Sequence, residues 1–185
     1  MDTKTAIRDS EDKMKKTIDV VHQHFQGIRS GRANPAMVEG LRVDYYGTPT
    51  PVKQMANITI PDPKTLVIHP WDASALKAIE KAINEANLGI APMVDGKSIR
   101  MVVPALTRER REELVKMVHK AAEEGRVSLR SIRREANEKI KQLEKEKKVT
   151  EDESFKAQTD IQKLTDRYIQ SIDQDQANKE KELQS

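Results

Sequence analysis

Apolar residues recur at helical spacing in three long segments of the chain. In the first segment the steps between them are seven, four or three residues, which is the spacing of one face of an α-helix. This stripe consists of Ile7, Met14, Ile18, Val21, Phe25 and Ile28. Gly27 weakens the end of the pattern, and we expect the helix to stop by Gly31.

The second segment is the longest, and its apolar positions step by four or three throughout. They are Leu114, Val118, Ala121, Gly125, Leu129, Ile132, Ala136, Ile140 and Leu143. Thr107 is a suitable N-cap, and Glu109 in the first turn meets the positive end of a helix. We predict a helix from about 107 to 148, which is roughly 60 Å long at ~1.5 Å per residue.

The third segment begins with Thr150-Glu151-Asp152-Glu153, a capping-box sequence. Its stripe is Ala157, Ile161, Leu164, Tyr168 and Ile172. Lys147-Lys148-Val149 forms a short turn before it, so the second and third helices are expected to be antiparallel neighbours. Three long amphipathic helices bury one another's stripes, which predicts a three-helix bundle.

Residues 32–106 have a different pattern and contain all eight prolines of the chain. Alternation predicts a half-buried strand at 41–46. Residues 47–51 are predicted to be a turn. The other predicted elements are strands at 58–60, 66–68 and 99–103 and a helix at 75–86. We expect Tyr45, Tyr46 and Trp71 to pack within this module rather than to bind a ligand.

The pattern therefore predicts an α+β fold, an elongated three-helix bundle with an inserted small β/α/β domain. The bundle comprises residues 1–31 and 106–185, and the inserted domain comprises residues 32–105. Two chain crossings join the parts, and few contacts need to cross such a connection, so it can act as a two-stranded hinge. The predicted hinge residues are Ala33, Asn34, Pro35, Pro104, Ala105 and Leu106.

The composition agrees with long, thin helices. Aromatic residues are only 3% of the chain, whereas a thick globular core usually carries more aromatic area. The absence of cysteine excludes disulfides, thiolate zinc sites and cysteine nucleophiles. No apolar run approaches the ~18 residues of a membrane span. Because no signal or transit segment precedes the first helix, we expect a bacterial cytoplasmic protein that binds no membrane.

The net charge is only +3, but its distribution is uneven. Residues 107–148 carry 14 basic and 9 acidic side chains, whereas residues 150–185 carry 5 and 9. A basic segment beside an acidic one can steer and orient a polyanion.

Arginines are concentrated on the second predicted helix. Arg126, Arg130 and Arg133 are four and three apart, so they share a face that flanks the apolar stripe, and Arg134 follows them. Arg29 and Arg32 add charge at the end of the first helix. One interpretation is an arginine row for the RNA backbone, because guanidinium groups bind phosphate bidentately. The other, which is the usual one for a charge run, is a solvated face paired with the acidic third helix.

The remaining chemistry argues against an enzyme. His22 and His24 are two apart on a helix and diverge, so they cannot share a metal. The sequence has no glycine-rich phosphate loop and no nucleophile elbow. We expect no catalytic residue, no metal and no cofactor. The lack of aromatics among the arginines favours folded RNA, recognised through shape and phosphates, over stacked single strands.

Several motifs resemble one known family, the ribosome recycling factors. They are Ile28-Arg29-Ser30-Gly31-Arg32-Ala33-Asn34-Pro35, Tyr45-Tyr46-Gly47-Thr48-Pro49-Thr50-Pro51, Pro104-Ala105-Leu106-Thr107-Arg108-Glu109-Arg110-Arg111, Val127-Ser128-Leu129-Arg130-Ser131-Ile132-Arg133-Arg134-Glu135-Ala136-Asn137, Thr150-Glu151-Asp152 and Gln162-Lys163-Leu164-Thr165-Asp166. The resemblance runs from end to end and in order. Ala105 departs from it, since many members have a second proline there, and Arg108 often has an acidic counterpart.

The resemblance implies an L-shaped, tRNA-like, monomeric factor. Its partners would be the large ribosomal subunit with its ribosomal RNA, and elongation factor G. With that partner and GTP it would split the post-termination ribosome and so release it from mRNA. The family's RNA contacts would fall on Arg29, Arg32, Arg130 and Arg133, with Arg110 near the hinge. The rival interpretations are a coiled-coil adaptor that binds proteins only and a non-specific RNA chaperone.

Overall fold

The computed structural model describes residues 2–184 and divides them into two compact units. The first unit runs to Arg29 and resumes at Arg108, and the second is Ser30–Thr107. The sequence placed these boundaries at 31/32 and 105/106, and the structure places them at 29/30 and 107/108. None of the helices in residues 2–184 combines the length and the apolar character needed to cross a membrane.

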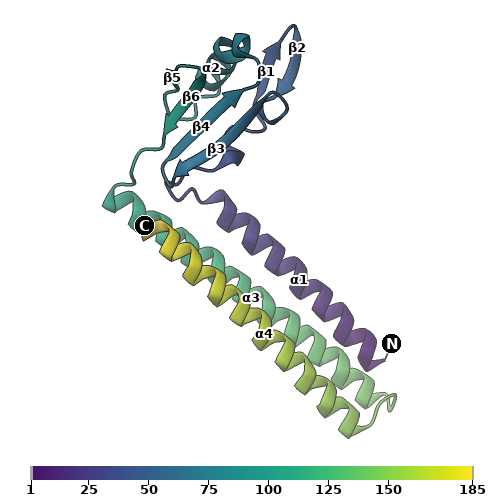
Figure 1. The fold of residues 1–185 in the computed structure, drawn as a ribbon. Coiled ribbons are helices and arrows are strands. Elements are labelled where there is room, and N and C mark those ends of the chain that lie inside the picture. The colour runs from purple at the N-terminus through teal and green to yellow at the C-terminus, as the bar shows by residue number, and fades with distance from the viewer. Residues whose placement is uncertain (1, 185) are drawn as a thin grey trace. The chain divides into compact units, whose positions relative to one another are not determined.

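The first unit is a bundle of three long helices that lie side by side (Figure 1). They are α1 (Thr3–Gly27), α3 (Arg108–Lys145) and α4 (Glu151–Gln184). The predicted stripes face the interior, with Met14 of α1, Leu129 of α3 and Ile161 of α4 fully buried. The fold class is thus confirmed for the helical part, because each helix supplies one apolar face to a shared core.

The turn between α3 and α4 is closed by backbone and side-chain bonds at both helix ends. The amide of Lys148 donates to the Leu143 carbonyl at 2.9 Å, and the amide of Lys147 donates to the Glu144 carbonyl at 2.9 Å. This pair of bonds is a Schellman motif, with Lys147 at φ +56° in the position that glycine usually takes. The predicted capping box follows: the amide of Thr150 donates to Glu153 at 2.8 Å, and the amide of Glu153 donates to the Thr150 hydroxyl at 3.2 Å.

Gly125 of α3 lies against both of the other helices of the bundle. A Cβ atom added there would lie 2.5 Å from Cγ2 of Val21 on α1 and 3.0 Å from Cδ1 of Ile172 on α4. Real Cβ atoms do not approach other carbons to 2.5 Å, so the absence of a side chain sets the distance between the helices at this level. The glycine at a stripe position is therefore a packing requirement of the bundle.

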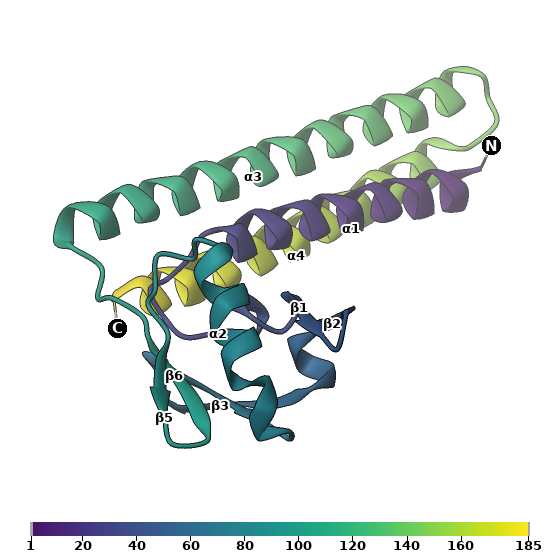
Figure 2. The same ribbon diagram turned by 90° about the horizontal axis from the view of Figure 1, so that it is seen from above.

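The second unit contains two antiparallel sheets, one short α-helix and three 3-10 helices. A two-stranded hairpin pairs β1 (Arg42–Tyr45) with β2 (Thr48–Pro51). The four-stranded sheet has the order β3-β4-β6-β5, from β3 (Ala56–Asp62), β4 (Thr65–Pro70), β6 (Ser98–Val102) and β5 (Met93–Asp95). Helix α2 (Leu76–Glu85) completes the unit, and Figure 2 gives a second view of it. Ile68, Ile79 and Ile99 are buried together in one core.

Two predictions for this unit were wrong in detail. Residues 48–51 form strand β2 rather than part of a turn, and the turn itself is only Tyr46 and Gly47. Pro49 and Pro51 fit because β2 is the edge of a two-stranded sheet, where a missing amide donor costs little. Strand β5 was not predicted at all, since its three residues are all exposed and show no alternation.

Candidate nucleic-acid interface

The arginines of α3 share one rim of the helix but differ in what they contact. Arg126 is the most enclosed, with its side chain only 16% exposed. Its Nε donates to Asp173 of α4 at 2.8 Å, its Nη1 donates to Glu123 at 3.3 Å, and its Nη2 bonds Gln176 of α4. Arg126 is therefore paired with an acidic residue of α4 and is largely enclosed.

Arg130 and Arg133 are less occupied. The Arg130 side chain is 40% exposed, and its Nη1 lies 3.4 Å from Glu123, a carboxylate that it shares with Arg126. Arg133 donates from Nη1 to the neutral amide oxygen of Gln162 at 3.2 Å. Within residues 2–184, Arg133 has no carboxylate at ion-pair distance. Arg134 is exposed and, in the same part of the chain, has no hydrogen-bond or ion-pair partner. This end of the row therefore has fewer carboxylate contacts than Arg126 has.

The other predicted site residues lie outside this stretch of α3. Arg29 is exposed at the end of the segment that carries α1, in the bundle unit. Arg32 is exposed in the second unit, so these two belong to different units. Arg110 lies in the first turns of α3 and donates to Glu113 at 2.9 Å.

A polar network behind Arg126 was missed from the sequence. Gln176 is buried, and its side-chain amide lies 2.9 Å from Nδ1 of His119, whose Nε2 pairs with Glu180 at 2.9 Å. A buried amide needs such partners, because an unsatisfied polar group in a core is costly. Gln176 follows Ile172 by four residues and so lies on the apolar stripe of α4. A polar residue at such a position was the sequence signal that could have predicted a buried polar network.

The predicted hinge residues lie in the second unit as the structure divides the chain. The amide of Ala33 donates to the carbonyl of Pro63 at 2.8 Å, which ties this segment to the small domain. Gly31, at φ +72°, has no room for a Cβ, which would lie 2.9 Å from the Cγ of Leu106. Both crossings are therefore held by contacts within residues 30–107.

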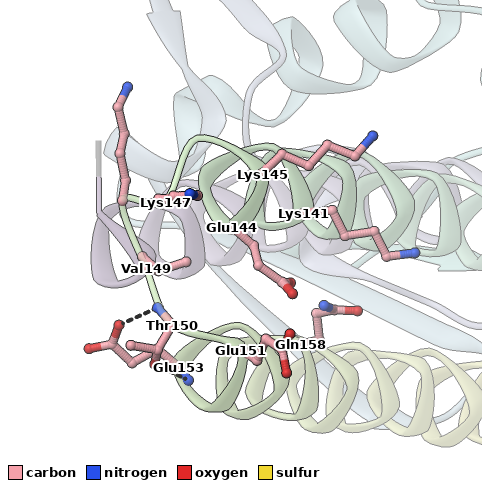
Figure 3. Close-up of a pocket in the computed structure, with 10 residues that line it drawn as sticks. Lys141, Glu144, Lys145, Lys147, Val149, Thr150, Glu151, Glu153 and Gln158 are labelled. Atoms are coloured by element: carbon pink, nitrogen blue, oxygen red, sulfur yellow. Dashed lines mark hydrogen bonds between the residues drawn. The ribbon is translucent and has the colours of Figure 1, made fainter.

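A hollow of about 740 Å³ lies at the turn between α3 and α4, where Figure 3 shows side chains of both helices around it. Its charged lining is four lysines and three glutamates: Lys141, Lys145, Lys147, Lys148, Glu144, Glu151 and Glu153. The two signs nearly balance, and Glu153 is already used to cap α4. The lining therefore favours neither a purely anionic nor a purely cationic ligand.

Two of the four histidines pair with carboxylates. His22 of α1 lies 2.5 Å from Asp175 of α4, and His119 pairs with Glu180 as described above. Across the described residues, no group of three or more His, Cys, Asp or Glu side chains is placed to hold a metal ion.

The aromatic residues of the small unit correct one expectation. Tyr45 does pack against the core, but Tyr46 is 80% exposed and Trp71 is 70% exposed. The prediction that both would be packed was wrong. Tyr46 lies in the two-residue turn after β1, and Trp71 follows the last residue of β4, so neither side chain is on a covered face of a strand.

Comparison with known proteins identifies the chain. Residues 21–183 match the family model described as "Ribosome recycling factor". A ribosome-recycling factor of Symbiobacterium thermophilum is 54% identical over 181 residues, which is 98% of each chain. One of Heliobacterium modesticaldum is 55% identical over 176 residues, 95% of each chain.

Solved structures agree. A solution structure of the ribosome recycling factor is 42% identical with a TM-score of 0.76, covering 100% of this chain and 98% of that one. Models for the T. thermophilus ribosome recycling factor and the E. coli elongation factor G bound to the E. coli post-termination complex give a 46% identical chain. Its TM-score is 0.65, and 99% of each chain is covered.

The fold is a helical bundle with an inserted small α+β unit and a row of arginines on the longest helix. Together with these matches, it defines a factor of translation. The chain belongs to the ribosome recycling factor family. Its function is accordingly ribosome recycling at the end of protein synthesis, and the expectation drawn from the motifs is confirmed.

Proposed function

We propose that the bundle binds ribosomal RNA of the large subunit through the end of the α3 arginine row, formed by Arg130, Arg133 and Arg134. The observation that carries the proposal is the position of these three side chains and their lack of carboxylate contacts compared with Arg126. They follow one another along one rim, and in the described part of the chain, residues 2–184, only Arg130 of the three has a carboxylate at ion-pair distance, Glu123 at 3.4 Å.

Physical chemistry favours phosphate as their ligand. Guanidinium groups stay charged at all physiological pH values and bind phosphate oxygens in a bidentate fork. A helix of 38 residues supported by two others holds such groups at fixed positions along a rod. Folded RNA presents its phosphates at defined positions, so a rigid row matches it better than a flexible one.

We also propose Arg29, Arg32 and Arg110 as contacts with ribosomal RNA, with less structural support than the α3 row has. Arg29 and Arg32 are exposed and are carried by different units, so their joint use would depend on how the units are placed on the ribosome. Arg110 would have to exchange its bond with Glu113 for phosphate. We assign Arg126 mainly to the bundle, because α4 already satisfies its guanidinium group.

We further propose that this chain acts with elongation factor G, as the T. thermophilus factor in the post-termination complex suggests. GTP hydrolysis would belong to that partner, and the chain would make or break no covalent bond itself. We propose a cytoplasmic monomer, because translation in bacteria takes place there and one copy has a complete bundle core. The proposed hinge lies at the two crossings, where the chain passes between the units.

The test is a ribosome-splitting assay with purified post-termination ribosomes, elongation factor G and GTP. The chain is expected to produce free subunits only when elongation factor G and GTP are both present. In a separate sedimentation experiment, the fraction of the chain that pellets with large subunits should fall steeply as the salt concentration rises. A salt-independent association, or equal binding to unrelated folded RNA, would show that the arginine row is not a ribosomal site.

A further inference from the structure

A buried amide of α4 joins an arginine of α3 to a histidine of the same helix. Gln176 is only 8% exposed, and it lies between Arg126 and His119. Its Oε1 accepts a hydrogen bond from Nη2 of Arg126, and its Nε2 lies 2.9 Å from Nδ1 of His119 and 3.0 Å from Oε1 of Glu180. Both donors of the amide are therefore used, and its oxygen is taken by the guanidinium group.

The chemistry of the partners fixes the proton on the histidine ring. A guanidinium group donates hydrogen bonds and accepts none, so the end of the Gln176 amide that faces Arg126 must be its oxygen. The NH2 group then faces His119, and it can bond only a ring nitrogen that carries no proton. Nδ1 of His119 is therefore bare, and the ring proton is on Nε2, which donates to Glu180 at 2.9 Å. The network thus selects one tautomer of the neutral ring.

A second proton on His119 does not fit this arrangement. The ring is 59% exposed, so protons reach it from water. A proton on Nδ1 would set two donors, the ring N–H and the Gln176 NH2 group, against each other. The amide relieves the conflict by turning over, which brings its oxygen to Nδ1 and its NH2 group to Arg126. Two donors then meet at the other end, so the bond between Gln176 and Arg126 is lost.

The charges around His119 hold a protonated ring in place. Glu180 of α4 already contacts Nε2, and it forms an ion pair with the ring once the ring is charged. Lys179, the neighbour of Glu180, pairs with Glu182 at 3.2 Å instead. Within residues 2–184, α1 brings no charged side chain to hydrogen-bond or ion-pair distance of His119. The charged side chains of α3 nearest to it in sequence are Lys116, Lys120 and Glu123.

We propose that Gln176 and His119 are positioning residues for Arg126: a proton on His119 releases Arg126 from Gln176, and the released group joins the end of the α3 arginine row in binding RNA phosphate. The partners that Arg126 keeps, Asp173 and Glu123, are each more than half exposed, so phosphate can replace them at little cost. By linkage, phosphate bound to Arg126 favours the charged ring. The use of the released group for RNA rests on the proposed function, whereas the release itself does not.

Nuclear magnetic resonance of the free, isotope-labelled full-length chain tests the release. The chain is titrated from about pH 8 to about pH 5.5, a range in which histidine side chains commonly change charge. At the alkaline end we expect the nitrogen shifts of His119 to show a bare Nδ1 and a protonated Nε2. As the ring becomes charged, the Nη protons of Arg126 should exchange faster with water, with the same midpoint as the ring. A neutral ring with its proton on Nδ1, or Arg126 signals that ignore the ring, overturns the proposal.

Sedimentation with large ribosomal subunits tests where the released group goes. The slope of log affinity against log salt should be steeper at about pH 5.5 than at about pH 8 by about 0.8, the value for one further phosphate contact. Binding with the same slope at both pH values shows that RNA does not use Arg126 and overturns that part of the proposal. An absence of binding at both pH values counts against the α3 row itself, and the titration of the free chain still decides the release.

Two variants bracket the parent chain. His119→Asn places an amide oxygen near the position of Nδ1, so Gln176 keeps its acceptor and no proton can be taken up. This variant should keep the alkaline slope at both pH values. Gln176→Leu removes the connection, so it should show the steeper slope at both. His22→Asn is the matched control, because His22 pairs with Asp175 of α4 outside this network, and it should keep the pH dependence of the parent chain.

A structural role alone would give a different result. If Gln176 and His119 only held the helices together, both variants would melt at a lower temperature and the exchange of the Arg126 Nη protons would keep its dependence on pH. His119→Asn retains every bond of the Gln176 amide that carries the argument, so it decides the question even if Gln176→Leu fails to fold. Full pH dependence of the Arg126 exchange in His119→Asn would show that another group controls Arg126.

Discussion

Two stretches of α3 carry the same residue type on the same rim, yet the structure gives them different tasks. Around Arg126 the helix is drawn close to its neighbours, and the guanidinium group is enclosed by Asp173, Gln176 and Glu123. One turn later, Arg130 has only the Glu123 carboxylate, which it shares with Arg126, and a further turn on Arg133 reaches only the neutral amide of Gln162. An arginine that is satisfied by its own fold contributes little to a ligand, whereas an unsatisfied one is available for phosphate.

The difference shows that spacing along a helix determines which arginines share a rim, but not which of them are available to bind a ligand. The acidic residues of α4 are not spread evenly opposite the arginines. Asp173 faces Arg126, whereas Gln162 occupies the corresponding place near Arg133. The partner helix therefore decides which cations remain free.

The close packing of α3 around Arg126 depends on Gly125. Of the substitutions considered, Gly125→Val should have the largest effect on stability. The added side chain would overlap Val21, and we expect a loss of about 3 kcal/mol in the free energy of unfolding. Urea denaturation followed by far-ultraviolet circular dichroism measures it. Gly27→Ala is the control, because nothing lies within 4 Å of a Cβ at that position. Equal stability of the two variants would mean that the helices are not held at the distance described.

The double substitution Arg130→Gln with Arg133→Gln tests the other end of the arginine row. We expect affinity for large ribosomal subunits to fall roughly 10- to 100-fold, and the slope of log affinity against log salt to become shallower by about 1.5, since two phosphate contacts are lost. Sedimentation at a series of salt concentrations gives both values. Circular dichroism should remain that of the parent chain. A large loss of stability with unchanged affinity per folded molecule would make these arginines structural.

Arg126→Gln should show the reverse pattern. Its bonds to Asp173 and Gln176 are partly shielded from solvent, so we expect the bundle to lose about 2 kcal/mol of stability. Affinity for the ribosome, corrected for the folded fraction, should change little. The control is Arg134→Gln, whose side chain is exposed and should alter stability by no more than about 0.5 kcal/mol. If Arg126→Gln weakens binding as much as the double substitution does, the two halves of the row act together.

The smallest expected effect concerns Glu123, which lies between the two halves. It contacts Arg126 at 3.3 Å and Arg130 at 3.4 Å, so Glu123→Gln should free Arg130 and tighten ribosome binding about twofold. Glu124→Gln removes the same charge from the neighbouring residue, and the difference between the two variants isolates the contact. A weaker affinity for Glu123→Gln would indicate that this carboxylate positions Arg130 rather than competing for it.

The helices of the bundle were predictable because their signals are local. Stripes at helical spacing and the capping box at Thr150 placed the end of α1, both ends of α3 and the start of α4 within a few residues of their observed positions. Strands β2 and β5 were missed for the opposite reason. Proline obscures the first, and the second consists of three exposed residues that are strands only because β6 pairs with them.

The candidate site was predictable in its residue types but not in its contacts. The spacing of Arg126, Arg130 and Arg133 showed a shared rim, but only the fold shows that Asp173 and Gln176, about fifty residues later in the chain, enclose the first of them. The exposure of Tyr46 and Trp71 was also beyond the sequence, because aromatic residues in a small module are usually core. Long-range packing, not local preference, determines both the enclosure of Arg126 and the exposure of the two aromatic side chains.

The close approach of Val21 to Gly125 also bears on how the protein is made. Synthesis delivers α1 first, but its apolar stripe finds its partners only after α3 and α4 have left the exit tunnel, with the whole small unit emerging in between. Contacts between such distant parts of a chain form late and slowly. The newly made α1 therefore spends most of translation with Met14 and Val21 uncovered, a natural target for chaperones that bind nascent chains.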